Sequence, residues 1–359
     1  MLMVFLFFVA KQLMYMIKQI LVILSAVFLL QCSKENVDKD AASTEEIYEV
    51  STYAGKESAG KTDGKREVAE FDYPSGLAID SKDNLYIVDA SNWSVRIIKS
   101  DGIVSTINAK SAPFSGSPNR ISVASDDEII ITQIYPSDHV LCKTYSEKNG
   151  LKNFILDTTP MDILDTGPAV KDSKGDYIFV GNSSLHKISS KLVVEKDWVK
   201  NIDISATMLD GNIITIDKND IIYTLPSDFQ SLFNGQIKTI SPDKSIKYIT
   251  GDHSNSDKIA YKDIDGALPK AAIGYVTGLC VDKNGVIYFI ENSIKTGCRV
   301  RKISNNIVTT LAGGTEQGYK DGVGIEAKFG YLSGIAVDSK GNVFVSDDNR
   351  IRKISKVVK

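Results

Sequence analysis

Three tyrosines recur at one position of a repeated pattern, each three residues before a glycine that opens an apolar stretch. Neighbouring segments add one tryptophan and three carboxylates. Flat aromatic rings stack on the apolar faces of sugars and peptides, while carboxylates hydrogen-bond to their polar groups. The pattern therefore predicts a glycan- or peptide-binding surface built from Tyr73, Tyr275, Tyr331, Trp93, Asp89, Glu291 and Asp347.

The same residues have an alternative, structural interpretation. A tyrosine at the start of a strand can wedge between neighbouring sheets. Acids and arginines at fixed positions of a repeat commonly pair within one sheet. Such pairs are the competing interpretation for Asp89, Asp347, Arg96, Arg301 and Arg352.

Signals for catalysis are weak. A metal-dependent hydrolase needs several ligands that converge on one ion, whereas His139, His186 and His253 stand in unrelated contexts with no shared repeat position. The three acids Asp63, Asp265 and Asp321 each precede a glycine, which is typical of turns. No catalytic residue, metal ligand or cofactor is predicted, and calcium held by carboxylates is left as an open alternative.

An internal repeat must position these side chains. Val50–Gly55 matches Val308–Gly313 without a gap, and the register then holds for about 30 residues. Three copies share the same step of 13 residues from the aspartate of an Asp-Gly pair to a strand-opening glycine. In one copy the step runs from Asp265 to Gly278, which opens the strand Gly278–Asp282. A repeat of this kind outranks local propensity as a signal of the fold.

Each copy contains hairpins with period-two alternation, which gives four antiparallel strands per unit and indicates a propeller blade. Three further, degenerate units follow the same spacing at 120–156, 169–199 and 204–240. The last unit ends after its third strand, and Val50–Gly55 aligns with the missing fourth strand. The sequence therefore predicts an all-β, six-bladed β-propeller of four-stranded blades over residues 47–359, closed by the strand at 50–55.

The segments Gly76–Asp80 and Asn84–Asp89, with their partners Gly334–Asp338 and Asn342–Asp347, resemble the NHL repeat. Similar propellers include gluconolactonase-like metal-dependent hydrolases and an amidating lyase that uses histidine-bound zinc. The resemblance thus implies a metal-dependent lactonase or lyase as one alternative to a binding module. A purely structural scaffold is the other.

Residues 1–31 contain no acid and carry two apolar runs, Met1–Ala10 and Ile20–Leu30. The second run is too short to span a bilayer and has the length of a signal-peptide core. It ends in Leu29-Leu30-Gln31-Cys32, which resembles the lipobox of bacterial lipoproteins, in a form like that of Bacteroidota. The resemblance implies lipidation of Cys32 after removal of residues 1–31, and a periplasmic or surface-exposed outer-membrane lipoprotein. An ordinary N-terminal membrane anchor is the alternative.

The composition limits the partners. Residues 32–46 are polar and charged without apolar periodicity, which predicts a flexible tether. A net charge of −3, with both signs interspersed, gives no electrostatic footprint for nucleic acid. The expected partners of this monomeric propeller are a glycan, a peptide or an envelope protein, and the membrane through the lipid on Cys32. Besides Cys32 there are three cysteines, Cys142, Cys280 and Cys298, and this odd number implies no disulfide framework, although Cys280 and Cys298 could pair.

Overall fold

The computed structural model divides the chain into two compact units, Met1–Glu46 and Ile47–Lys359. The predictions for residues 1–45, including the signal peptide and Cys32, lie outside the described residues. No helix in the described part of the chain is long and apolar enough to cross a membrane. The structure describes residues 46–107, 114, 117–134, 140–155, 168–181, 184–200, 202, 213–225, 236–250, 264–268, 270–293, 296–314 and 316–357.

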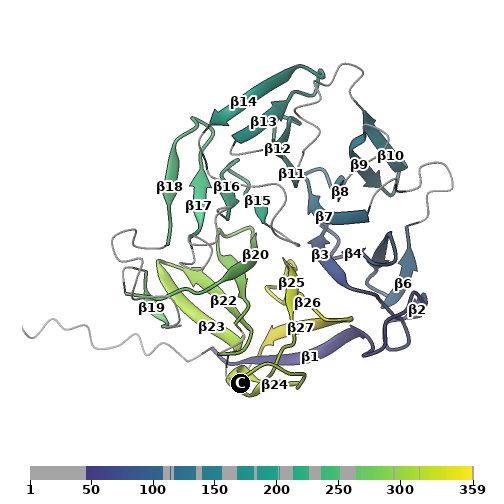
Figure 1. Ribbon diagram of the computed structural model, residues 1–359, viewed down its shortest axis with the longest axis vertical. Helices are drawn as coiled ribbons and strands as arrows, with labels where there is room; N and C mark the ends of the chain where they lie inside the picture. Colours follow the sequence, from purple (N-terminus) through teal and green to yellow (C-terminus); the bar gives the residue numbers. More distant parts are fainter. Residues whose placement is uncertain are drawn as a thin grey trace, which may run out of the picture. The chain divides into compact units, whose positions relative to one another are not determined.

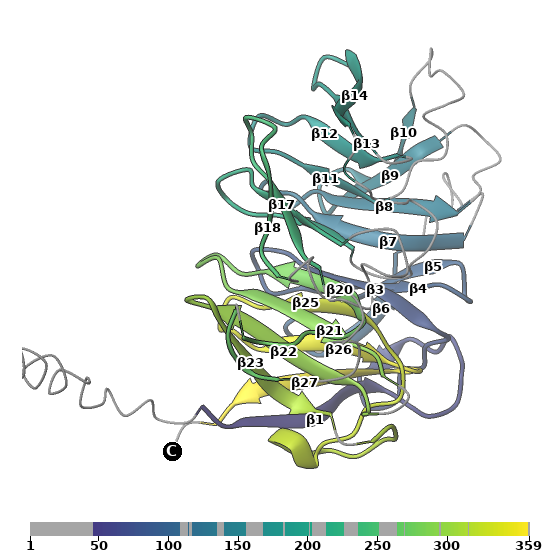
Figure 2. The same cartoon turned by 60° about the vertical axis from the view of Figure 1, so that its left-hand side comes forward.

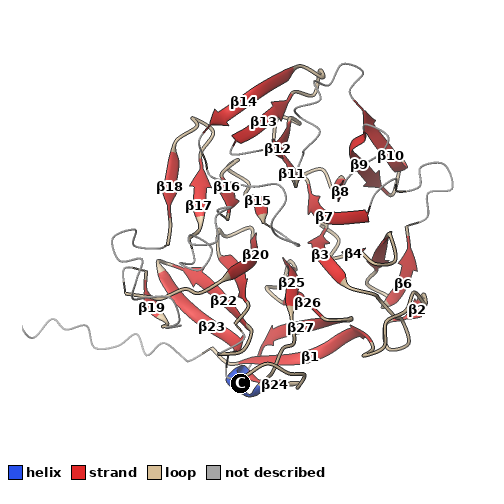
Figure 3. Ribbon diagram, viewed as in Figure 1, coloured by secondary structure: helices blue, strands red, loops and turns tan. Residues whose placement is uncertain are grey.

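The described part of the second unit forms six antiparallel sheets arranged in a ring, which confirms the six-bladed propeller (Figures 1 and 3). Blades 1, 5 and 6 are those with the clear sequence repeat. Blade 1 contains β3 (Pro74–Ile79), β4 (Leu85–Asp89), β5 (Ser94–Ile98), β6 (Ile103–Thr106) and β2 (Gly64–Lys65); blade 5 contains β20 (Val276–Val281), β21 (Ile287–Glu291), β22 (Arg299–Ser304), β23 (Ile307–Gly313) and β19 (Gly266–Ala267); blade 6 contains β25 (Leu332–Val337), β26 (Val343–Asp347), β27 (Arg350–Lys356), β1 (Tyr48–Gly55) and β24 (Gly322–Val323).

The three degenerate units are four-stranded blades. Two of them match the predicted ranges closely, but the third differs, because its fourth strand lies beyond residue 240, the predicted end of the unit. Blade 2 contains β7 (Ser117–Val123), β8 (Ile129–Ile134), β9 (Val140–Ser146) and β10 (Gly150–Ile155); blade 3 contains β11 (Ala169–Lys171), β12 (Tyr177–Val180), β13 (Ser184–Ile188) and β14 (Val194–Lys200); blade 4 contains β15 (Ile214–Ile216), β16 (Ile222–Thr224), β17 (Lys238–Ile240) and β18 (Ile246–Tyr248).

A short fifth strand distinguishes blades 1, 5 and 6 from the four-stranded expectation. In each of them the long loop before the first strand returns along the outer edge of the sheet. There it pairs for two residues with the fourth strand, as Gly64 and Lys65 do with Val104 and Ile103. The added strand and the 3₁₀ turn η2 (Gly324–Glu326) of blade 6 cover part of an edge that would otherwise present unpaired backbone groups.

The predicted closure of the ring is confirmed. β1 pairs antiparallel with β27 from Tyr48 opposite Lys356 to Gly55 opposite Arg350, with one bulge on the way (Figure 2). The first and last strands of the propeller therefore share one sheet. Opening the ring requires the loss of this pairing, since no other strand among the described residues takes the fourth position of blade 6.

The core lies between neighbouring blades. Leu77 of β3 packs with Ala336 and Phe344 of blade 6, while Ala78 of the same strand packs with Ile121 of blade 2. Successive residues of a strand point to opposite faces of its sheet, and here both faces are covered. This explains why β4, the second strand of blade 1, is buried at all five positions. The outermost strand of blade 3, β14, instead carries several exposed polar residues.

The innermost strands of neighbouring blades approach closely, and a glycine permits it. A Cβ atom on Gly334 would lie 3.0 Å from the Leu77 backbone nitrogen and 3.1 Å from the Gly76 carbonyl carbon. Gly334→Ala is expected to lower the free energy of unfolding by about 1–3 kcal/mol, because backbone cannot move aside as a flexible side chain can. Chemical denaturation measures the change. Gly341→Asn is the control, since that turn position has open space and a left-handed φ of 83° that asparagine tolerates.

The possible disulfide between Cys280 and Cys298 is not formed: both are free and buried, as is Cys142. Cys298 instead donates its thiol proton to the Gly330 carbonyl at 2.9 Å. Burial raises the pKa of the Cys142 and Cys280 thiols, so neither is activated for exchange.

Candidate functional site

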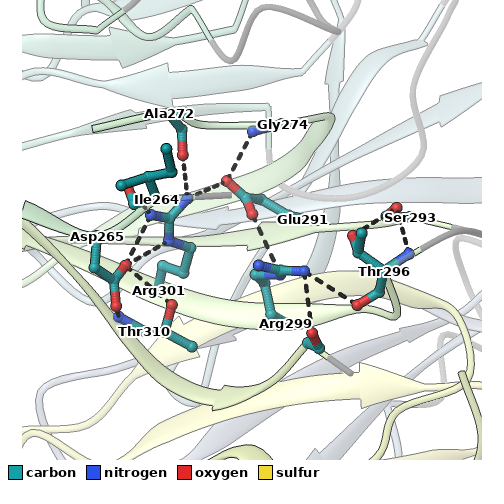
Figure 4. Close-up of polar contacts among 11 residues, drawn as sticks. Ile264, Asp265, Ala272, Gly274, Glu291, Ser293, Thr296, Arg299, Arg301 and Thr310 are labelled. Carbon is teal, nitrogen blue, oxygen red and sulfur yellow. Dashed lines mark hydrogen bonds and ion pairs between the residues drawn. The ribbon is translucent and has the colours of Figure 1, made fainter. Parts of the chain in front are cut away.

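A buried arginine in the third strand of blade 5 holds the long loop that precedes the blade (Figure 4). Arg301 is fully buried, and its guanidinium donates to Glu291 Oε1 at 2.8 Å and Asp265 Oδ1 at 2.8 Å. It also donates to the carbonyl oxygens of Ala272 at 2.9 Å and Ile264 at 3.0 Å. One side chain thus ties two strands of the blade to both ends of a loop segment, and we call this arrangement an arginine clamp.

Blades 1 and 6 contain the same clamp. Each has a fully buried arginine between a buried acid at the end of the second strand and a half-exposed acid in the loop. The predicted within-blade pairing of acids and arginines is confirmed. The pairs are Arg96 with Asp89 at 2.8 Å and Asp63 at 2.6 Å, and Arg352 with Asp347 at 2.5 Å and Asp321 at 2.7 Å.

The interpretation of Asp63, Asp265 and Asp321 as simple turn residues is incomplete. Besides the arginine, each of these carboxylates accepts a hydrogen bond from a backbone N–H of the fourth strand, at 2.8–3.0 Å. The donors are Thr106, Thr310 and Thr52. The acid therefore fastens the loop to the outer part of the blade, and the glycine after it enters the fifth strand.

Asp89, Glu291 and Asp347, three of the predicted ligand contacts, are at most 1% exposed. Burial raises the pKa of Asp89 above its usual range, and it raises the pKa of Asp347 to about 6 although Arg352 and the Gly330 N–H oppose the shift. In this structure the three carboxylates contact arginines and loop backbone. Their direct effect is to fix the loops that precede the first strands of blades 1, 5 and 6.

Strand register identifies the corresponding position in blades 2, 3 and 4. Each clamp arginine lies opposite the third residue of a second strand, as Arg96 lies opposite Ile87. The same place is held by Lys143 opposite Ile131, His186 opposite Phe179 and Lys238 opposite Thr224, all buried. A basic or imidazole side chain thus occupies this position in all six blades, although the sequence signature is lost in three.

His186 therefore does occupy a repeat position, contrary to the expectation that it has none. It is a buried core histidine whose Nδ1 accepts from the Asp197 N–H at 3.0 Å, and burial lowers its pKa. His139 and His253 lie outside the described residues. Among the side chains that the structure describes, no three of His, Cys, Asp or Glu gather closely enough to hold a metal ion.

Two aromatic side chains of blade 1 are exposed, one just before its first strand and one just before its third strand. Tyr73 is 39% exposed and Trp93 is 55% exposed. The carbonyl of Tyr73 accepts from the Ala90 N–H at 3.3 Å, and the Ala90 carbonyl accepts from the Trp93 N–H at 3.0 Å, so hydrogen bonds connect the two segments. Both residues have a left-handed backbone, with φ of 54° and 51°, which costs a non-glycine residue about 1–2 kcal/mol.

The exposed aromatic residue of blade 6 at the repeat position of Tyr73 is Tyr331. Tyr331 is 41% exposed, and its carbonyl accepts from the Asp348 N–H at 3.3 Å. The residue after Asp348, Asn349, accepts from the Tyr73 N–H at 3.1 Å and thereby joins blade 6 to blade 1. Trp93, Tyr73 and Tyr331 form a connected set across two blades, which we call the aromatic row.

Tyr275 is placed differently. It is half-buried and packs against the core cluster of blades 4 and 5 that includes Ile273 and Val276. The structural interpretation of a tyrosine at a strand entrance is therefore confirmed for Tyr275. The spacing does not distinguish it from the other two tyrosines, because all three lie at the same repeat position.

The comparisons with known proteins agree with this architecture. A structure from Bacteroides thetaiotaomicron of unknown function is 19% identical, with a TM-score of 0.69, and the match covers 87% of this chain and 77% of that one. An auxiliary nutrient binding protein from the same organism is also 19% identical, with a TM-score of 0.64 and the same coverage. Virginiamycin B lyase from Staphylococcus aureus is 12% identical, with a TM-score of 0.55, covering 87% of this chain and 100% of the lyase.

These structural similarities, all below 25% identity, establish the fold alone. No curated protein matches the sequence. The family model of the teneurin NHL domain matches residues 52–304, which is most of the chain. The match covers part of β1, blades 1 to 4, and blade 5 up to the end of its third strand. The chain therefore belongs to the teneurin NHL domain family.

Proposed function

We propose that the protein is an envelope-anchored binding module that takes a glycan or peptide on the aromatic row. The observation that carries the proposal is the conformation of Tyr73 and Trp93. Both side chains are large, aromatic and exposed, and both residues have a left-handed backbone that is unfavourable for residues other than glycine. Strain of this kind persists where the surroundings enforce it, and it concentrates at ligand sites. Exposed rings held in place can stack on a sugar or an apolar side chain.

The arginine clamps support the same proposal. They fix the loops before blades 1 and 6, and the segments that carry Tyr73 and Tyr331 follow these loops directly. A surface fixed before binding loses less conformational entropy when the ligand arrives. The structurally similar auxiliary nutrient binding protein supports a binding role of this general class. Lipidation at Cys32 is the proposed means of attachment to the outer membrane.

The test is a glycan and peptide array followed by titration calorimetry of the hits. Trp93→Ala and the double variant Tyr73→Ala with Tyr331→Ala are each expected to weaken binding about tenfold or more, since a stacked ring contributes on the order of 1–3 kcal/mol. Tyr248→Ala, on the outer strand of blade 4 and 51% exposed, is the matched control. Full affinity in the variants, with the fold intact by circular dichroism, would show that the ligand binds elsewhere.

The same preparations distinguish the two alternatives. Bound zinc or calcium in elemental analysis, together with turnover of a lactone, would replace the proposal with a metal-dependent hydrolase. Absence of any array hit, with cross-links to envelope proteins in intact cells, would favour a scaffold.

A further inference from the structure

The chain enters the propeller on the face opposite the aromatic row. Strands in a blade alternate in direction, so the second and fourth strands begin on one face and the first and third begin on the other. β1 is the fourth strand of blade 6 and begins at Tyr48, opposite Lys356 at the end of β27. Tyr73 precedes a first strand and Trp93 precedes a third strand. We call the face on which β1 begins the tether face.

An apolar hairpin tip stands on the tether face of blade 3. The turn between β13 and β14 exposes Leu192 by 54% and Val193 by 65%. Leu192 also has a left-handed φ of 62°, whereas the equivalent turn in blade 1 uses Gly102, with φ of 77°. Leucine is less favourable than glycine in this conformation because its Cβ crowds the following carbonyl oxygen, and the exposure of its side chain is unfavourable as well.

The tip is firmly held and flanked by cations. Ser189 donates its N–H to the Val193 carbonyl at 2.9 Å, and its Oγ accepts from the Val193 N–H at 3.0 Å. The Ser190 N–H donates to Asp176 Oδ1 at 3.1 Å, which fixes the tip against the turn between β11 and β12. Lys191 in the tip and Lys174 in that turn are both exposed. Apolar side chains beside lysines suit the boundary between lipid tails and headgroups.

The length of the tether allows this contact. Ile47 lies fifteen residues after Cys32, and a stretch of that number of residues reaches at most about 50 Å. A tether of this length makes the second contact intramolecular, with an effective concentration on the order of millimolar. Two partly inserted apolar side chains are then sufficient, because burial of apolar surface stabilises a contact that the tether already holds close.

We propose that the hairpin tip 189–193 contacts the lipid surface to which the protein is anchored, so that the aromatic row points away from that surface. This inference rests on the proposed anchor at Cys32. The exposed apolar tip and the chain entry share one face, and a bilayer is the partner that the tether brings to it.

The experiment uses the lipidated protein in phosphatidylethanolamine and phosphatidylglycerol vesicles. An environment-sensitive fluorophore is attached at Val193→Cys or, as the opposite-face control, at Trp93→Cys; the native Cys142, Cys280 and Cys298 are buried. Lipids with a quencher in the upper acyl chain are expected to lower the emission at position 193 about twofold and to leave position 93 unchanged, because only the tip enters the interface.

A second variant tests the apolar contact itself. Leu192→Asn removes the apolar side chain without adding strain, because asparagine tolerates the left-handed turn. In that background the quenching at position 193 is expected to fall while thermal stability is kept. Equal quenching at positions 193 and 93, or none at 193 in vesicle-bound protein, overturns the orientation but not the anchor. Failure to sediment with vesicles overturns the anchor and the orientation with it.

Discussion

Val50→Asp is expected to abolish the cooperative folding of the propeller or to lower its free energy of unfolding by more than about 4 kcal/mol. Val50 is 1% exposed in the closing strand and packs in one core cluster with Val300 and Ile354. The carboxylate would be buried among apolar side chains without a partner, which is among the most costly single substitutions. Because the pairing of β1 with β27 joins the two ends of the ring, the substitution destabilises the closure of the ring.

The neighbouring residue provides the control. Ser51 is exposed on the other face of the same strand, so Ser51→Asp is expected to change stability by no more than about 0.5 kcal/mol. Denaturation followed by tryptophan fluorescence compares the two variants. Similar losses from both substitutions would mean that β1 is not packed as the closing strand.

Arg96→Met is expected to cost about 3–5 kcal/mol of stability, because it leaves the fully buried Asp89 without its ion partner. It also removes the donors to the Glu70 and Thr62 carbonyls, which hold the loop before Tyr73. Faster hydrogen exchange in residues 56–72 and weaker ligand binding on the aromatic row should accompany the loss of stability.

Two further variants make this result specific to the clamp. Arg66→Met removes a partly exposed arginine paired with the exposed Glu67 and is expected to cost no more than about 1 kcal/mol. Arg96→Met with Asp89→Leu removes both buried charges and should recover part of the stability. If the double variant is no more stable than Arg96→Met, the loss of stability arises from the loop contacts and not from the buried carboxylate.

Blade number and ring closure could be predicted from the sequence because both depend on local, repeated patterns. Alternating apolar residues and the constant step between Asp63 and Gly76 recur along the chain, and the missing last strand leaves Val50–Gly55 as its replacement. The end of blade 4 was predicted wrongly, since its three-residue strands are too short for a clear alternation.

The arrangement of the site was decided by tertiary structure. Asp63 lies 33 residues before Arg96, and only the return of the loop along the blade brings them together. Likewise, pairing of the strands, not spacing, shows that His186 occupies the position of a clamp arginine.

The sequence by itself determined the repeat, the blade count and the chemical types available at each repeat position, because these follow from periodicity along the chain. Only the tertiary structure decided which of those residues face solvent. Tyr73 and Tyr331 are exposed, whereas Tyr275 is half-buried and Asp89 is covered. The physical reason is that exposure depends on the neighbouring blade and the overlying loop, which differ around the ring even where the spacing is identical.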